Sequence, residues 1–351
     1  MAKLRDLIGV VKDKASQSKA ALLSKRATLT LLRATSHDSF TPPTPKHLST
    51  LLSSGDGSRA TAAAAVELLM DRLQRTHNSA VALKCLIAVH HIVKRGTFIL
   101  QDQLSVFPAA GGRNYLKLSD FRDNTTPTSW QLSSWVRFYA QYIEQLLCTS
   151  RTLGLFFIGS PHSNDGSREE RASGLTNADL LEETDSLLTL IDEIGRKPSD
   201  SSASISNNGN KLVEEIANLL EEDWDCIMKE VWARVKEFRE RLLGCLSFGE
   251  AVELVCELKR MEENKEMRKM VVEGRFWDVV REVKEKADLE AHKEEEEGGG
   301  GRRVKLYDFR NARRRHRASE SDRFVKVKPF LHPEDSLRFH SGRILSSVTV
   351  H

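Results

Sequence analysis

Residues 33–52 read Arg-Ala-Thr-Ser-His-Asp-Ser-Phe-Thr-Pro-Pro-Thr-Pro-Lys-His-Leu-Ser-Thr-Leu-Leu, which indicates the end of one helix, a proline-rich turn and the start of another. Thr44 is a typical N-cap residue. Pro45 follows at the first helical position, where the N–H that proline lacks would have no helical partner. Lys46 and His47 then fall in the first turn of the second helix. The stretch therefore predicts two helices joined by a short, stiff turn.

A helix start of this kind attracts anions, because its unpaired N–H groups and the positive end of its dipole favour negative charge. Arg33 ends the preceding helix and is expected to converge with Lys46 and His47 on one spot. Lys25 and Arg26 would add to the positive field. The arrangement predicts a phosphate-binding site. The alternative is a polar turn between packed helices, with its charges solvated.

The same three positions resemble the signature of the ANTH family, the phosphoinositide-binding N-terminal domain of clathrin assembly proteins. Residues 82–91 and 134–142 resemble later helices of that family, and the likeness covers about residues 1–270. It implies that Arg33, Lys46 and His47 bind a phosphoinositide, most of all phosphatidylinositol 4,5-bisphosphate. It also implies clathrin, other adaptors and vesicle SNAREs as partners. The implied location is cytosolic and peripheral, on plasma-membrane clathrin-coated pits, clathrin-coated vesicles and the Golgi.

Composition favours an all-α chain. Charged residues make up 29% of the 351 residues and aromatics 7%, and no segment alternates strictly between apolar and polar residues. Together with the family resemblance, this predicts a right-handed solenoid of stacked antiparallel helices. Helices are expected over residues 3–25, 27–36, 45–53, 59–75, 81–94, 129–153, 175–194, 211–243 and 248–293. Polar loops are expected at 159–174 and 199–210.

Four parts are predicted along the chain. They are an amphipathic N-terminal helix (1–26), an ENTH-like phosphoinositide-binding core (27–158), a helical extension of the ANTH domain (175–293) and a disordered linker with a basic tail (294–351). The net charge of +3 conceals an uneven distribution, because residues 1–50 hold nine Lys or Arg against three Asp. A basic N-terminal end suits an anionic surface.

The N-terminal helix carries a thin apolar stripe between lysine-rich flanks. The stripe consists of Leu4, Ile8, Val11, Ala15 and Leu22, and the flanks hold Lys3, Arg5, Lys12, Lys14 and Lys19. Such a helix can lie in a bilayer interface. Alternatively, the stripe packs on the rest of the domain, and the sequence leaves both interpretations open.

Two further patterns could indicate binding sites, but we favour a purely structural role for each. Asp179-Leu180-Leu181 resembles a clathrin-binding peptide, but Leu180 belongs to a helically spaced apolar stripe, which indicates a core-facing position. His77, His90 and His91 lack a ligand at metal spacing, so structural roles are expected, with no metal site and no cofactor. The five cysteines show no paired spacing, which predicts buried, reduced thiols in a cytosolic protein.

No phosphate-binding loop, G-x-S-x-G, H-E-x-x-H or dinucleotide motif occurs, which argues against an enzyme. No apolar run reaches the ~18–20 residues of a spanning helix, so membrane contact is expected to be peripheral. The arginine-rich segment 313–317 raises nucleic acid as a partner, but few aromatic residues accompany it, which disfavours base stacking. The preferred interpretation is a clathrin adaptor. The alternative is a helical protein-interaction scaffold that does not bind lipid.

Overall fold

The computed structural model describes residues 2–22, 26–37, 40–108, 114–154, 165–198, 210–241, 246–271 and 274–297. All regular structure in these ranges is helical, which confirms the predicted all-α solenoid. The predicted disordered tail lies outside the described residues from residue 298 onward, as does most of the loop predicted at 199–210.

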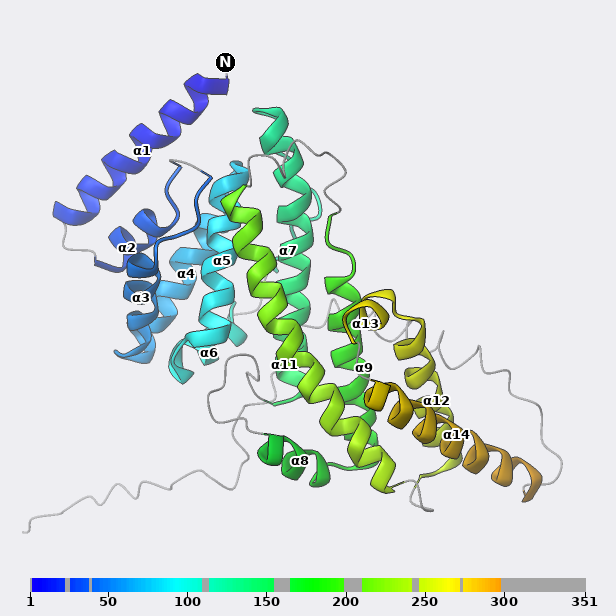
Figure 1. Ribbon diagram of the computed structural model, residues 1–351. Helices are drawn as coiled ribbons and strands as arrows, with labels where there is room; N and C mark the ends of the chain where they lie inside the picture. The colour runs from blue at the N-terminus through cyan, green and yellow to red at the C-terminus, as the bar shows by residue number, and fades with distance from the viewer. Residues whose placement is uncertain are drawn as a thin grey trace, which may run out of the picture.

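The N-terminal half consists of α1 (Ala2–Leu22), α2 (Arg26–Ala34), α3 (Pro45–Leu52), η1 (Ser53–Gly55), α4 (Arg59–Arg75), α5 (Ser79–Arg95), α6 (Phe98–Ser105) and α7 (Pro127–Thr152). The second half consists of α8 (Asp165–Ser173), α9 (Asn177–Ile194), α11 (Lys211–Arg241), α12 (Phe248–Glu263), α13 (Lys265–Met270) and α14 (Gly274–Glu297). Figure 1 shows α1 to α3 at one end of the stack and α12 to α14 at the other.

The centre of the stack is α5, in which every side chain from Ser79 to Lys94 is buried. It packs against α4 on one side and α7 on the other, and α7 continues the contact to α9. The sequence explains the position, because α5 is almost continuously apolar rather than striped, as expected of a helix that is buried all round.

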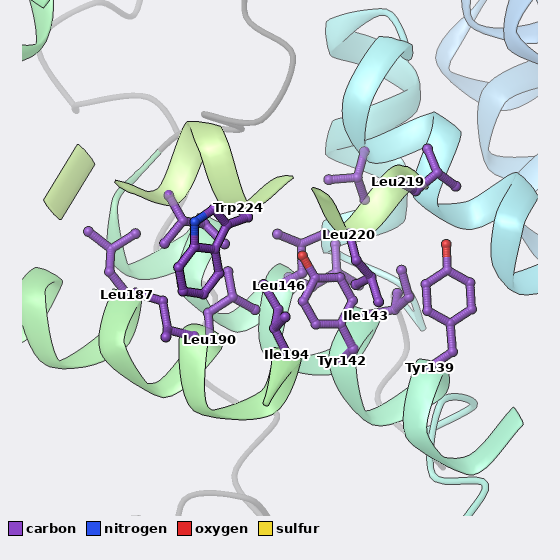
Figure 2. Close-up of a cluster of buried hydrophobic side chains, with 14 of the residues drawn as sticks. Tyr139, Tyr142, Ile143, Leu146, Leu187, Leu190, Ile194, Leu219, Leu220 and Trp224 are labelled. Carbon is purple, nitrogen blue, oxygen red and sulfur yellow. The ribbon is translucent and has the colours of Figure 1, made fainter. Parts of the chain in front are cut away.

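Aromatic and aliphatic side chains join α7, α9 and α11. Figure 2 shows Tyr139 and Tyr142 of α7 beside Leu219 and Leu220 of α11, while Trp224 of α11 lies over Leu187 of α9. Both tyrosine side chains are fully buried. Burying this apolar surface is the main favourable contribution to joining the two halves.

Several expected boundaries were wrong. Residues 165–173 form α8 rather than a loop, and the expected single helix 248–293 is three helices. Asn264 makes one of these breaks, because its side chain caps α13 by accepting the Met267 N–H at 2.9 Å. The short helix α6 was not predicted. Among the described cysteines only Cys85 is buried, so the expectation of buried thiols fails for Cys148, Cys226 and Cys256.

Candidate functional site

The proline-rich turn leads into α3 as the sequence predicts. Thr44 is extended, with φ −67° and ψ 147°, and its side chain accepts the N–H of His47 at 3.4 Å. Pro45 occupies the first turn, and Pro43 is buried beneath the turn. The cap and the two prolines fix the direction in which α3 begins.

Positive side chains meet at this helix start. Arg33 and Lys46 are exposed, and His47 is partly buried. The pKa of His47 is lowered, first by burial and then by the positive charges of Arg33 and Lys46. Helix α2 packs against α3, and both cations lie near enough to His47 for their charge to act on its imidazole. Lys25 lies outside the described residues, and of Arg26 only its place at the start of α2 is described.

The exposed charges described around this site are cationic. Among the described side chains of residues 7–52, the exposed charged groups are Lys12, Lys14, Lys19, Arg33 and Lys46. The single carboxylate within the same set, Asp13, is 5% exposed. Within this described set no exposed carboxylate opposes the cations, so these side chains present one sign of charge to an approaching ligand.

A buried carboxylate holds α1 on the core. Asp13 accepts the backbone N–H of His37 at 2.8 Å and lies 2.7 Å from the Nδ1 of His37. Arg72 of α4 donates to the other oxygen of Asp13 at 3.0 Å. Burial raises the pKa of Asp13, but the hydrogen bond from His37 and the charge of Arg72 outweigh it and lower the pKa. This clasp has no local signal in the sequence, because its three residues are far apart along the chain.

Close approach of α1 to the core also needs a glycine. A Cβ added to Gly9 would lie 2.7 Å from the Cδ2 of His37, so a larger residue would push α1 away. Gly9, Asp13 and the buried Ala20 therefore mark the inner face of α1.

The apolar stripe of α1 points to solvent. Within the stripe, Ile8 is 46% exposed and Val11 63%, and the neighbouring Leu7 is 61% exposed. On a helix Val11 lies opposite Gly9 and Asp13, which contact the core, and Leu7 and Ile8 lie on either side of Val11. The interpretation that the stripe packs on the domain is therefore wrong for Ile8 and Val11. Leu4 and Leu22 lie outside the described side chains.

Of the other two candidate patterns, the leucine pair and two of the three histidines, His90 and His91, lie in the core, while His77 is exposed. Leu180 is fully buried and Leu181 is 1% exposed within α9, so the clathrin-peptide interpretation of Asp179-Leu180-Leu181 is corrected: packed helical leucines cannot be bound as an extended peptide. In the part of the chain that the structure describes, no cluster of His, Cys, Asp or Glu could hold a metal ion. His90 is buried and its Nδ1 lies 2.7 Å from the Tyr139 hydroxyl.

A known protein family matches more than half of this chain. The ANTH domain family matches residues 28–222, from α2 into α11. The chain belongs to the ANTH-domain family. Its charged α2–α3 turn and the central helix α5 both lie inside the matched region of this ANTH protein.

Relatives of this ANTH protein occur in Arabidopsis thaliana. One is 51% identical over 296 residues, covering 80% of this chain and 80% of the relative. A second is 32% identical over 246 residues, covering 68% and 69% of the two chains, and a third is 29% identical over 307 residues, covering 81% of this chain and all of the relative. The names of all three describe clathrin assembly proteins. Within the described residues, no helix has both the length and the apolar character needed to cross a bilayer.

Proposed function

We propose that this ANTH-domain protein is a peripheral membrane adaptor for clathrin coats, a binding protein and not an enzyme. Arg33, Lys46 and His47 bind the phosphates of phosphatidylinositol 4,5-bisphosphate, with Lys25 and Arg26 adding positive field. The observation that supports the proposal is that α2 packs against the capped start of α3, with Arg33 and Lys46 exposed and their charges acting on His47. Phosphates suit such a place, because the positive end of the helix dipole and the cations act on them together.

The charges by themselves give weak binding. A basic residue near an anionic membrane contributes roughly 1 kcal/mol, so four or five contribute about 4–5 kcal/mol. That free energy corresponds to a dissociation constant on the order of a millimolar to a few hundred micromolar. Lasting attachment therefore requires a further contact. The outward apolar face of α1, flanked by Lys12, Lys14 and Lys19, supplies it by lying in the interface.

The clathrin part of the proposal rests on the relatives, whose names describe clathrin assembly proteins. The chain would act at clathrin-coated pits and vesicles, with other adaptors and vesicle SNAREs as further partners and the Golgi as a further location. Multivalent attachment within a coat would raise its effective affinity for the membrane. The rival function is an α-helical scaffold that binds proteins only.

Replacing Lys46 and His47 with alanine tests the headgroup site. Binding to vesicles that contain phosphatidylinositol 4,5-bisphosphate is expected to weaken by at least about tenfold. The reason is that the double variant loses a cation, Lys46, and a hydrogen-bond donor to the phosphate, His47. Co-sedimentation with vesicles of defined composition measures the effect.

A matched control removes two exposed lysines elsewhere. Lys211 and Lys229 lie exposed on α11, so Lys211→Ala with Lys229→Ala reduces net charge without touching the turn. This control should bind vesicles as the wild type does. Equal binding by the Lys46/His47 double variant and the wild type would support the scaffold instead.

The α1 face is tested separately by replacing Leu7 and Val11 with serine. Vesicle binding is expected to weaken by roughly tenfold or more, because two apolar side chains no longer enter the interface. Thermal unfolding in the absence of vesicles should change little, since both side chains are exposed. Weaker binding together with a large loss of thermal stability would show instead that the stripe supports the fold.

A further inference from the structure

An exposed aromatic residue stands in the turn that connects the parts of the proposed headgroup site. Phe40 is 41% exposed and lies seven residues after Arg33 and seven before His47. Its side chain belongs neither to the hydrophobic core nor to the group of cations at the start of α3. Single exposed apolar residues are common on protein surfaces, so exposure alone carries no functional meaning.

Phe40 is distinguished by its neighbourhood. Four of the nine large exposed apolar side chains in the described chain fall within residues 7–40: Leu7, Ile8, Val11 and Phe40. Gly9 of α1 lies against the ring of His37, and Phe40 follows His37 by three residues. Three residues of extended chain span at most about 11 Å, so Phe40 begins close to α1.

The turn holds Phe40 in a defined position. Pro42 and Pro43 follow it, and their rings fix φ over two successive residues. Pro43 is buried, and Thr44 caps α3, which anchors the C-terminal side of the turn. A side chain presented by such a stiff segment loses little conformational freedom when it enters a partner.

We infer that Phe40 inserts into the headgroup–acyl boundary of an anionic bilayer, beside the phosphoinositide headgroup, and forms with the outer face of α1 one shallow insertion surface. This inference rests on the proposed function and adds a residue to it. Phe40 anchors the turn in the bilayer while Arg33 and Lys46 engage phosphates. The membrane contact then has two apolar parts, one on the turn and one on α1.

The charge of the surroundings selects a bilayer as the occupant. Lys12, Lys14 and Lys19 on α1 and Arg33 and Lys46 at the turn are exposed, and no exposed carboxylate opposes them among the described side chains of residues 7–52. Apolar side chains ringed by cations match a surface that offers negative headgroups above an acyl layer. A protein groove would have to supply acidic groups on every side of an apolar pocket.

The variant Phe40→Ala tests the inference on the full chain against two probes. Binding to vesicles of phosphatidylcholine, phosphatidylserine and phosphatidylinositol 4,5-bisphosphate is expected to weaken by about tenfold. Binding to soluble inositol 1,4,5-trisphosphate should stay unchanged, because the cations remain. Phe98→Ala is the matched control: Phe98 is 57% exposed on α6, away from the turn, and its loss should leave both measurements unchanged.

Three results would overturn the inference. They are wild-type vesicle binding by Phe40→Ala, an equal loss toward vesicles and soluble headgroup, and an equal loss in Phe98→Ala. The headgroup site fails separately, if the Lys46/His47 double variant keeps its affinity for the soluble headgroup. The two failures are therefore distinguishable.

A second variant reports insertion directly. In Phe40→Trp, tryptophan emission is expected to be quenched by vesicles with brominated acyl chains more strongly than the emission of the wild type, which has five tryptophans. Quenching equal to that of the wild type would place residue 40 outside the bilayer and contradict the inference.

Discussion

Replacing Asp223 with alanine is expected to lower the free energy of unfolding by about 3–5 kcal/mol, the usual cost of removing one partner from a buried ion pair. Asp223 is fully buried on α11 and joins three groups from α5 and α7. One oxygen accepts from the Lys94 ammonium at 2.9 Å. The other accepts the Tyr142 hydroxyl at 2.6 Å and lies 2.7 Å from the Nε2 of His90.

The expected cost is large because the partners stay buried after the carboxylate is lost. The Lys94 side chain is 5% exposed and would keep only Glu222, which is 54% exposed. The hydroxyl of Tyr142 would lose its acceptor in a fully buried position, and an unmade hydrogen bond in the interior costs the desolvation of the donor. The network ties α11 to the N-terminal half, so the whole stack is destabilised.

Urea denaturation followed by tryptophan fluorescence measures the change, and Asp225→Ala is the matched control. Asp225 lies two residues along the same helix and is exposed, so its replacement should change stability by less than about 0.5 kcal/mol. Equal, small changes in both variants would contradict the role of Asp223.

The same carboxylate predicts a pH dependence. Burial raises the pKa of Asp223, but the charge and hydrogen bond of His90, with Lys94 and Tyr142, outweigh it and lower the pKa. A lowered pKa in the folded state adds stability above the unfolded-state value near 4, and that stability is lost as pH falls toward the folded value. Asp223→Ala should therefore approach the wild type in stability at strongly acidic pH.

Replacing Arg234 with alanine is the second change expected to cost about 3–5 kcal/mol. Arg234 is fully buried on α11 between two acidic side chains. It donates to Glu230 at 2.8 Å and, through two of its nitrogens, to Glu183 of α9. Without the guanidinium, two buried carboxylates would face each other.

Glu183 already bears a cost in the folded protein. Its pKa is raised by burial, even though the charge and hydrogen bonds of Arg234 act to lower it. In Arg234→Ala the pKa of Glu183 should rise further, so part of the destabilisation should be relieved as pH falls and the carboxyl binds a proton.

Thermal and urea unfolding of Arg234→Ala should be compared with those of Arg239→Ala. Arg239 lies on the same helix, is 45% exposed and pairs with the exposed Glu282, and exposed pairs contribute at most about 1 kcal/mol. A loss below 1 kcal/mol in Arg234→Ala would show that Arg171, which also contacts Glu230, replaces it.

The features that could be predicted from the sequence are those that depend on residues close together along the chain. The N-cap at Thr44 and the proline at the start of α3 were predicted correctly, because both depend on residues within one turn. The boundaries of α4 were also correct, since alanines favour a helix and Gly57 precedes it. The cluster of Arg33, Lys46 and His47 followed from the same short stretch.

The rest depends on partners distant in sequence. Helix α8 was missed because it is strongly polar, and its arginines Arg168 and Arg171 are held by Glu230, about sixty residues later. The Asp13 clasp joins residues 24 and 59 positions apart, so neither the docking of α1 nor the outward direction of its apolar stripe has a local signal.

The central helix α5 has no solvent-facing side, and this determines the order in which parts of the molecule unfold. Thermal fluctuations open first those segments with few buried contacts, and release last the segment enclosed by all the others. The outer helices each have one face in water, so they can unfold locally while α5 and its packing remain intact. The N-terminal helices of such a protein can change position without unfolding the rest of the stack.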